Sequence, residues 1–500
     1  MHKDKIKKII RAAVFTAGLC LIVCKLSDIM ELKNSRQMYS DFYETEENFD
    51  VLFLGTSHVS NGILPLELWN DYGIASYNMS GHGNQLATTY WVLKNALDYT
   101  EPKLVFVDCS YLGEDAKTSL VSMNQTHIAL DSIPFSINKI RMVNDLFENA
   151  EDKAEFLSDF IIYHGRWSEL TKDDFDWTKL SFKGAAPGYE VAVPQVVEKV
   201  DEEQKSDPNV NGVVYLRKII EECQEDGIDV VLTYLPFPAA ADKQKESHLA
   251  NDIAKEYDIP YINFLTMDVT DMDTDCQDPD SHLNISGARK VTDYLGSYIM
   301  DNYDIQDHRQ DAEYAAWNDE YDNYSLSMTE YLKAQTELKN ELMLLANENI
   351  STCVYVNGNS PVLADSQTLE LIQNVVYFNT DIAGKNNMAK RKKTVPDSMN
   401  DEKSECLVSG AAANGMDYFL ITDSSSGLVW QSCGNEELIR INTGFGEVNY
   451  TRDNDGSPVL TINKENSEDM GNYLTGAGQC NAQIIIIDNI TGNIEAVMTF

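Results

Sequence analysis

The sequence predicts an α/β domain with a doubly wound parallel sheet, followed by a C-terminal all-β module. Apolar runs at residues 51–54, 104–108 and 229–235 have the continuous character of parallel strands that are covered on both faces. Helix-like stretches separate these runs, which indicates right-handed crossovers. After residue 350 the pattern changes to short β-rich runs between Gly, Asn, Asp and Ser clusters. The chain has 500 residues, more than a single hydrophobic core usually organises, so at least two folded units are expected.

The chain begins with a basic segment that leads into an apolar one. Lysines and Arg11 precede the apolar residues 12–24, and Lys25 closes them. This pattern is that of a short membrane anchor or a signal peptide. We favour an uncleaved transmembrane helix within residues 1–30, since no small-x-small cleavage site follows. Positive charge before the helix predicts a cytoplasmic N-terminus and extracellular folded domains.

The overall charge excludes a class of partner. A formal net charge of −41 would repel a phosphate backbone, so no nucleic-acid partner is expected. The nine cysteines lie at wide spacing, with no zinc-type pairing and no dense disulfide framework. Disulfides among the later cysteines remain open at this stage.

We expect the α/β domain to span residues 45–303. Its segment 113–210 has scattered aromatic and acidic residues without a clean repeat, and we interpret it as an insertion that covers or lines the site. The remaining expected elements are helices at 86–98, 213–225, 242–257 and 286–301 and a strand at 261–264.

The rest of the chain divides into a connector and the β-rich domain. Residues 304–347 predict an acidic helical connector whose aromatic stripe packs on the first domain. In the β-rich domain, residues 348–500, two segments at 418–430 and 484–495 each read as a hairpin with a glycine turn, Gly427 and Gly492. The basic residues between 385 and 393 predict an exposed loop.

Two distant segments carry the candidate chemistry. Ser57 follows an apolar strand that breaks at Gly55, where open α/β sheets place their chemistry. His282 follows two carboxylates, Asp278 and Asp280, near the end of the domain. A serine hydroxyl needs a neutral imidazole to take its proton and a carboxylate to fix that imidazole's tautomer. We therefore predict Ser57 as nucleophile and His282 as base.

Some assignments at this site stay open. Asp280 is the first choice for orienting His282, and Asp278 is close behind. His58 and His82 could compete as bases, but we rank His282 first because sequence neighbours of a nucleophile rarely reach its hydroxyl from the correct side.

Residues 50–303 resemble the SGNH/GDSL hydrolase superfamily. Within it they resemble the membrane-anchored cell-envelope branch that includes the D-alanyl transfer protein of teichoic acid synthesis and the alginate O-acetylation proteins. The resemblance rests on Gly55-Thr56-Ser57-His58, on Asp280-Ser281-His282-Leu283-Asn284 and on the N-terminal anchor. It implies a flavodoxin-like three-layer α/β/α fold and acyl-ester chemistry. Pro279 stands where the common Asp-x-x-His spacing has its carboxylate.

The resemblance also implies an oxyanion hole. Its donors would be the Ser57 amide, a Gly81 or Gly83 amide and the Asn84 side chain, although this loop departs from the usual Gly-x-Asn-Asp pattern.

The functional expectation is an extracytoplasmic, bacterial O-acyltransferase or esterase that forms an acyl-serine intermediate and needs no metal or organic cofactor. Its substrate would be a cell-surface polysaccharide or teichoic-acid-like polymer. A multi-spanning membrane acyltransferase is the partner that the resemblance implies. The alternative is a catalytically inactive surface protein that binds glycan or acts as a scaffold.

Overall fold

A five-stranded parallel sheet forms the centre of the α/β unit in this computed structural model. The structure describes residues 2–30, 39, 41–45, 47–175, 182–389, 401–433, 438–454, 456–463, 472–474, 480–489 and 493–500. The sheet's strands, in spatial order, are β2 (Ser76–Ser80), β1 (Val51–Gly55), β3 (Leu104–Asp108), β4 (Asp229–Tyr234) and β5 (Tyr261–Asn263). This is the strand order of a doubly wound sheet. The direction in which successive strands are added reverses between β1 and β3, and such sheets bind their ligands at that point. The predicted parallel sheet is confirmed.

The sequence analysis missed strand β2. Asn78, which precedes the predicted oxyanion loop with Gly81 and Gly83, pairs with Phe53 inside the sheet. The alternating polar residues of this strand, Ser76, Asn78 and Ser80, hide it from an apolar-run criterion, although all three are buried. Asn78, for example, donates from Nδ2 to Ile63 O at 2.8 Å.

Helices cover both faces of the sheet. One face packs on α5 (Leu86–Ala96), α10 (Asn211–Glu225) and α11 (Ala241–Tyr257). The other packs on α4 (Pro65–Tyr72) and α13 (Ile285–Asn302). Successive residues of β1 point to opposite faces, so Leu52 joins the first layer and Phe53 the second.

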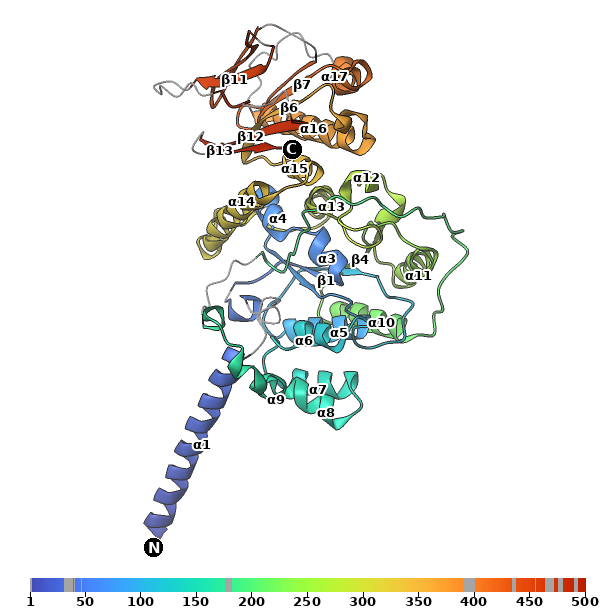
Figure 1. Cartoon of the computed structure of the whole chain (residues 1–500). Coiled ribbons are helices and arrows are strands. Elements are labelled where there is room, and N and C mark those ends of the chain that lie inside the picture. The colour runs from blue at the N-terminus through green and yellow to red at the C-terminus, as the bar shows by residue number, and fades with distance from the viewer. Residues whose placement is uncertain are drawn as a thin grey trace.

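The segment between β3 and α10 adds short helices and an extended stretch. Its helices are α6 (Met123–Leu130), α7 (Ile137–Leu146), α8 (Ala150–Leu157), α9 (Asp159–Tyr163) and the 3₁₀ helix η1 (His164–Ser168). Helices α6 to α9 lie on the side of the unit from which α1 emerges (Figure 1). Residues 189–200, called the strap below, have no helix or strand and cross the loop that carries His282.

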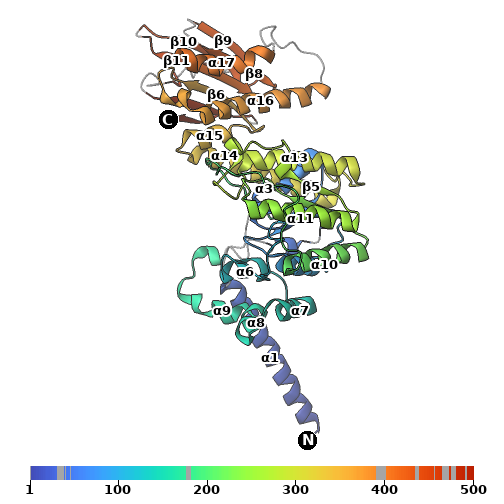
Figure 2. The ribbon, with the colours of Figure 1, turned by 90° about the vertical axis from the view of Figure 1, so that its right-hand side faces the viewer.

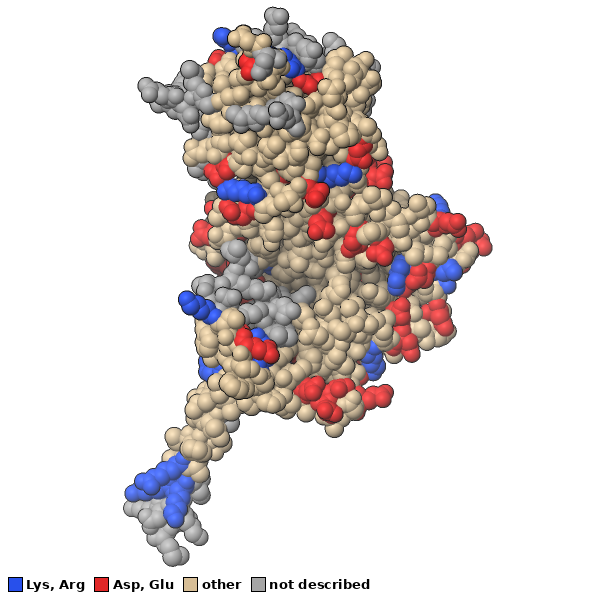
Figure 3. Space-filling model, in the orientation of Figure 1, with Lys and Arg blue, Asp and Glu red and all other residues tan. Residues whose placement is uncertain are grey.

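Helix α1 (His2–Met30) extends away from the folded units (Figure 1). Its window Ile10–Ser27 is long and apolar enough to cross a membrane, as an anchor or as a signal sequence, and none of it is buried in the protein. Basic side chains gather near the N-terminal end of this helix, whereas acidic ones are spread over the α/β unit (Figure 3).

Two helices, α14 (Ala316–Ala334) and α15 (Leu338–Leu344), connect the units. The aromatic stripe packs as predicted at Tyr314, Trp317 and Tyr324, which are buried. Trp317 lies against Trp69 of α4, with ring centroids 5.1 Å apart.

The C-terminal unit, residues 350–500, lies at the opposite end of the molecule from α1 (Figure 2). Its larger sheet contains β13 (Ile494–Thr499), β12 (Ala482–Asp488), β6 (Ile350–Val356), β7 (Tyr418–Asp423) and β8 (Leu428–Cys433), all antiparallel. A smaller antiparallel sheet contains β11 (Pro458–Asn463), β10 (Gly446–Arg452) and β9 (Leu438–Thr443). The hairpin at 418–430 is confirmed, with Gly427 at φ +70°. The second hairpin is present as β12 and β13, and Gly492 lies outside the described residues.

The predicted C-terminal β module is confirmed as an antiparallel one, but it is not all-β. Helices α16 (Ser366–Ala389) and α17 (Asp401–Asn414) belong to this unit and pack on β7 and β8. Leu371, Ile372 and Val375 of α16 are buried, and their spacing is the helical period that the sequence analysis overlooked. The predicted basic loop is also wrong for residues 385–389, which are helical, and residues 390–393 lie outside the described part of the chain.

Candidate active site

Ser57 is the first residue of a short helix, α3 (Ser57–Gly62), that follows β1 directly. Thr56 caps this helix by accepting a hydrogen bond from His58 N at 3.2 Å. Gly55 permits the tight turn, because a Cβ there would lie 2.8 Å from both Asp108 Cβ and Val59 Cγ2. The strand end therefore fixes the position of the Ser57 hydroxyl at the carboxyl edge of the sheet.

His282 lies in the loop between α12 (Met272–Asp275) and α13, and it meets Ser57 across 225 residues of sequence. Its Nε2 is 2.8 Å from Ser57 Oγ, and its Nδ1 is 2.5 Å from Asp278 Oδ2. The loop is closed by a β-bridge between Cys276 and Leu283. Asn284 then caps α13 by accepting from the amides of the helix's first turn.

The first choice of orienting carboxylate, Asp280, is wrong. Asp280 is exposed, and its Oδ1 accepts from the Ser281 hydroxyl at 3.1 Å. Asp278 reaches His282 because its other oxygen, Oδ1, accepts from the backbone amides of Ser281 and His282 at 2.7 and 3.1 Å. These bonds fold the loop into a turn that places residues 278 and 282 side by side.

The same contacts set the charge of Asp278. Partial burial raises the pKa of this carboxyl, but the hydrogen bonds from the His282 ring and backbone lower it by more, so the net pKa lies below its usual value. An ionised Asp278 holds a proton on His282 Nδ1, which leaves Nε2 free to accept the proton of Ser57.

The structure separates His282 from the competing histidines. His58 Nδ1 is 2.9 Å from Ser110 Oγ, and its ring stacks on Phe237 with centroids 4.4 Å apart. Burial, followed by repulsion from His282, lowers the pKa of His58 to about 3, so this imidazole is neutral at physiological pH. The His82 ring centroid lies 6.0 Å from that of His282. Of the three rings, His282 is the one that contacts Ser57.

The loop between β2 and α5 holds the residues proposed for the oxyanion hole. The Gly81 amide donates to Gly55 O at 3.2 Å, so it is not available to a substrate and its assignment as a donor is wrong. Gly83 has φ +69°, and a Cβ there would lie 2.7 Å from Ser119 Oγ. The hydrogen bonds recorded for the loop do not use the Gly83 amide.

Asn84 has a buried side chain, 2% exposed, whose amide atoms have no hydrogen-bond partner of good geometry among the described residues. It lies against the Cα of Gly81, since a Cβ on that glycine would be 2.6 Å from Asn84 Nδ2. Tyr39 is also close: burial raises the pKa of its hydroxyl, the Asn84 side chain opposes this shift, and the hydroxyl donates to Ser80 O at 2.5 Å. A buried amide without a partner is costly, so Asn84 remains a candidate donor.

Asp108 and Ser110, at the end of β3, were missed by the sequence analysis. Burial raises the pKa of Asp108 to about 6, and the Ser110 hydroxyl opposes this shift. Asp108 Oδ1 also accepts from Leu235 N at 3.2 Å. The signal was available, because Asp108 ends a predicted strand and Ser110 follows it, as Ser57 follows its own strand.

The strap holds the loop that carries His282. Gln195 N donates to Pro279 O at 2.7 Å, and Gln195 Nε2 donates to Pro238 O at 2.8 Å. Ala192 N donates to Cys276 O at 2.9 Å. The strap thus joins this loop to the one that follows β4.

A cavity of about 490 Å³ lies next to the site, at the carboxyl ends of β4 and β5. Phe237, the ring that stacks on His58, forms part of its wall. Its other apolar lining residues are Val197, Val200, Ala239, Leu265 and Met267. This space can hold an apolar group beside Phe237.

One group of carboxylates among the described residues has metal-ligand proximity. Oxygen atoms of Asp271, Asp273 and Glu370 lie within 4.8 Å of one another. The hydrogen bond between the two carboxyl groups raises the pKa of Glu370 to about 7 and lowers that of Asp271, so a proton that Glu370 donates to Asp271 accounts for the close approach. None of the three belongs to the Ser57 site.

Comparison with known proteins adds little to this geometry. No protein-family model matches the chain, and no curated protein matches its sequence. One similar solved structure is a Bacteroides fragilis protein described provisionally as an acylhydrolase, with 12% identity over 54% of this chain and 98% of that chain, at a TM-score of 0.28. Similarity this low carries no argument, so the conclusions below rest on the site itself.

Proposed function

We propose that this protein is a serine acyl-ester enzyme, an esterase or O-acyltransferase. The observation that supports this proposal is the chain of contacts from Ser57 Oγ to His282 Nε2, at 2.8 Å, and from His282 Nδ1 to Asp278 Oδ2, at 2.5 Å. Nucleophile, base and orienting carboxylate each make the contact that their role needs.

The chemistry follows from these contacts. His282 accepts the Ser57 proton while the hydroxyl oxygen attacks the ester carbonyl. The tetrahedral oxyanion is stabilised by hydrogen-bond donors, for which we propose the amides of Ser57 and Gly83 and the side chain of Asn84. His282 then protonates the leaving alcohol, which leaves an acyl group on Ser57. Water or an acceptor hydroxyl, deprotonated by His282, completes hydrolysis or transfer.

The finer proposals concern fold type, location and substrate. The strand order β2-β1-β3-β4-β5 supports a flavodoxin-like domain of the SGNH type. The basic start and apolar course of α1 support an anchored protein whose folded units lie outside the cell. A cell-surface polysaccharide or teichoic-acid-like polymer, and a multi-spanning acyltransferase partner, remain part of this proposal by resemblance only.

A fluorophosphonate probe tests the proposal, because it reacts only with an activated serine. We expect the purified full-length protein to be labelled, Ser57→Ala to lose the label, and Ser327→Ala, which changes a serine on α14, to keep it. Hydrolysis of p-nitrophenyl acetate should fall by about 10³-fold or more in Ser57→Ala. Equal labelling of wild type and Ser57→Ala, or no labelling at all, would favour the inactive scaffold instead.

A further inference from the structure

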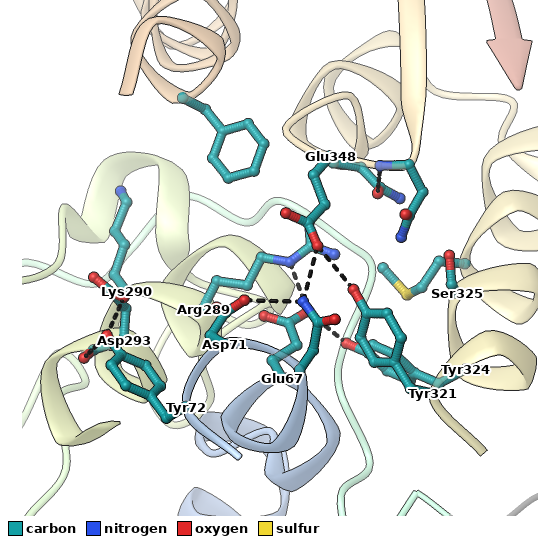
Figure 4. A pocket seen from close by; sticks show the side chains of 15 residues that line it. Glu67, Asp71, Tyr72, Arg289, Lys290, Asp293, Tyr321, Tyr324, Ser325 and Glu348 are labelled. Carbon is teal, nitrogen blue, oxygen red and sulfur yellow. Dashed lines mark hydrogen bonds and ion pairs between the residues drawn. The ribbon is translucent and has the colours of Figure 1, made fainter. Parts of the chain in front are cut away.

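A cavity of about 480 Å³ lies between the α/β unit and the segment that leads into the C-terminal unit (Figure 4). Its walls are α4, α13, α14 and residues 347–349, with Phe378 of α16 at one side. This volume is in the range of small-molecule sites. It does not include Ser57, His282 or Asp278. The cavity is called the inter-unit cleft below.

The charges that line the inter-unit cleft are mixed. Arg289 Nε pairs with Glu67 at 2.9 Å, and Lys290 pairs with the fully buried Asp275 at 2.7 Å. The carboxylate of Glu348 is exposed and accepts from Asn70 Nδ2 and Tyr321 Oη at 3.1 and 2.9 Å. Donors and acceptors therefore alternate along one wall (Figure 4).

This mixture disfavours a charged ligand. An anion would meet the carboxylates of Glu67, Asp71, Asp293 and Glu348, and a cation would meet the guanidinium of Arg289 and the ammonium of Lys290. A hydroxyl group, by contrast, both donates and accepts, so it gains from each kind of neighbour. The polar lining favours a neutral ligand with many hydroxyl groups.

Aromatic rings supply the other half of the site. Tyr72, Tyr321, Tyr324 and Phe378 line the inter-unit cleft, and Tyr324 donates to Glu67 at 2.8 Å. Rings with a polar tip present an apolar face beside a hydrogen-bonding group. The C–H face of a sugar ring fits such a wall while its hydroxyls reach the carboxylates and amides.

We propose that the inter-unit cleft binds a neutral saccharide unit. A second cavity, of about 240 Å³, shares Arg289, Lys290 and Phe378 with it and continues beside α16. The pair of cavities offers room for more than one unit of a chain. Helix α13 begins three residues after His282, and Arg289 lies four residues beyond its first residue, Ile285, or roughly 6 Å along the helix. The identification of this saccharide with the acyl acceptor rests on the proposed function.

The test is saturation-transfer NMR on the detergent-solubilised full-length protein. The probes are the neutral oligosaccharides maltotriose, cellotriose, N-acetylchitotriose and galactotriose, with choline as the cation and inorganic phosphate as the anion. We expect at least one neutral oligosaccharide to bind. Ser325→Trp, which places a large ring in the cavity, should weaken that binding at least tenfold. Leu326→Trp, on the outer side of the same helix, should leave it unchanged.

A second variant guards against misfolding of the first. Glu348→Gln keeps the shape of the side chain and removes its charge, and we expect it to weaken saccharide binding about fivefold. Binding of choline or phosphate alone, no binding of the four saccharides, or equal affinity in Ser325→Trp and wild type would overturn the proposal.

Failure of this inference and failure of the proposed function give different results. Saccharide binding that persists in Ser57→Ala, together with an unlabelled wild type, would leave a saccharide-binding protein without the enzyme. Ser57-dependent labelling without saccharide binding would leave the enzyme without this site.

Discussion

At Asp278 and Asp280, two carboxylates two residues apart have different surroundings. Asp278 contacts His282 Nδ1, whereas Asp280 is exposed and contacts Ser281. Asp278→Asn removes the acceptor that holds the proper tautomer of His282, so we expect kcat to fall by about 10²- to 10⁴-fold. Asp280→Asn should stay within about twofold of wild type, as exposed substitutions usually do. Ester hydrolysis by both variants measures this difference, and an equal loss would contradict the assignment of Asp278.

Glu341 is a buried carboxyl group whose proton affinity affects stability. Its side chain on α15 is fully buried, its carboxylate oxygens have no partner within the described part of the chain, and burial raises its pKa to about 8. The unfolded chain releases this proton near pH 4.3, so between that pH and about 8 the folded state binds more protons and stability falls as pH rises. Glu341→Gln should thus stabilise the protein at pH 8, by up to roughly 4 kcal/mol, and change little at pH 4.

Urea unfolding of wild type and Glu341→Gln at the two pH values tests this expectation. If wild type and Glu341→Gln differ in unfolding free energy by the same amount at pH 4 and at pH 8, burial does not hold the proton on Glu341.

The sequence sufficed to predict that Ser57 and His282 lie together, because one follows a strand and the other comes near the end of the same domain. It did not suffice for the carboxylate. Which of Asp278 and Asp280 faces His282 depends on the turn that backbone amides form around Asp278 Oδ1. It also did not show that the Gly81 amide is used by Gly55, since that bond forms between strand ends distant in sequence.

At the scale of elements, the strap is expected to act on the His282 loop through Gln195. Gln195→Ala removes the bond from Nε2 to Pro238 O, worth about 1 kcal/mol, and loosens the strap over Pro279. We expect kcat to fall about fivefold with KM little changed. Gln244→Ala is the matched control, because Gln244 contacts Val200 and Glu198 on the same strap but not Pro279. Equal effects of both variants would assign Gln195 a purely structural role.

His308 joins the segment after α13 to the start of β1. Its Nε2 and Nδ1 each lie 2.7 Å from a carboxylate oxygen, of Asp50 and Asp311 respectively. Burial lowers the pKa of His308, but these two carboxylates raise it by more. The stabilisation is complete below the unfolded pKa of about 6.5 and is lost as pH rises through the higher folded pKa.

His308→Gln should therefore cost about 1 kcal/mol of unfolding free energy at pH 5.5 and less at pH 9. Chemical denaturation across this range measures the change. A cost that grows with pH would contradict the assignment of a charged His308.

The elements differ in how well the sequence predicts them. Strands β1, β3 and β4 each contain a continuous apolar run of the kind expected for burial on both faces, and this run identifies them. Strand β2 escapes because Ser76, Asn78 and Ser80 are polar yet buried. Helix α16 was not predicted, because the Asn and Gly residues near its end are typical of a loop. Its apolar face is buried against β7 and β8, which lie further along the chain.

At the scale of the whole molecule, α1 is the expected means of attachment. Its apolar side chains are exposed, including Val14, Phe15 and Leu21 at 68, 72 and 68%. Removal of residues 1–30 should move the protein from the membrane pellet to the supernatant while Ser57 is still labelled. Ultracentrifugation after carbonate extraction measures this shift. Full-length protein that is already in the supernatant would contradict an uncleaved anchor.

Helix α13 begins at Ile285, three residues after His282, carries Arg289 in the inter-unit cleft, and ends at Asn302. Its 18 residues form a rod roughly 27 Å long. A rigid helix of this kind keeps the distance between the inter-unit cleft and the Ser57 site constant. If a polymer of repeating units is bound in the inter-unit cleft and modified at the Ser57 site, each modified unit will lie a constant number of units from the bound one. The product will then show regularly spaced modifications rather than random substitution.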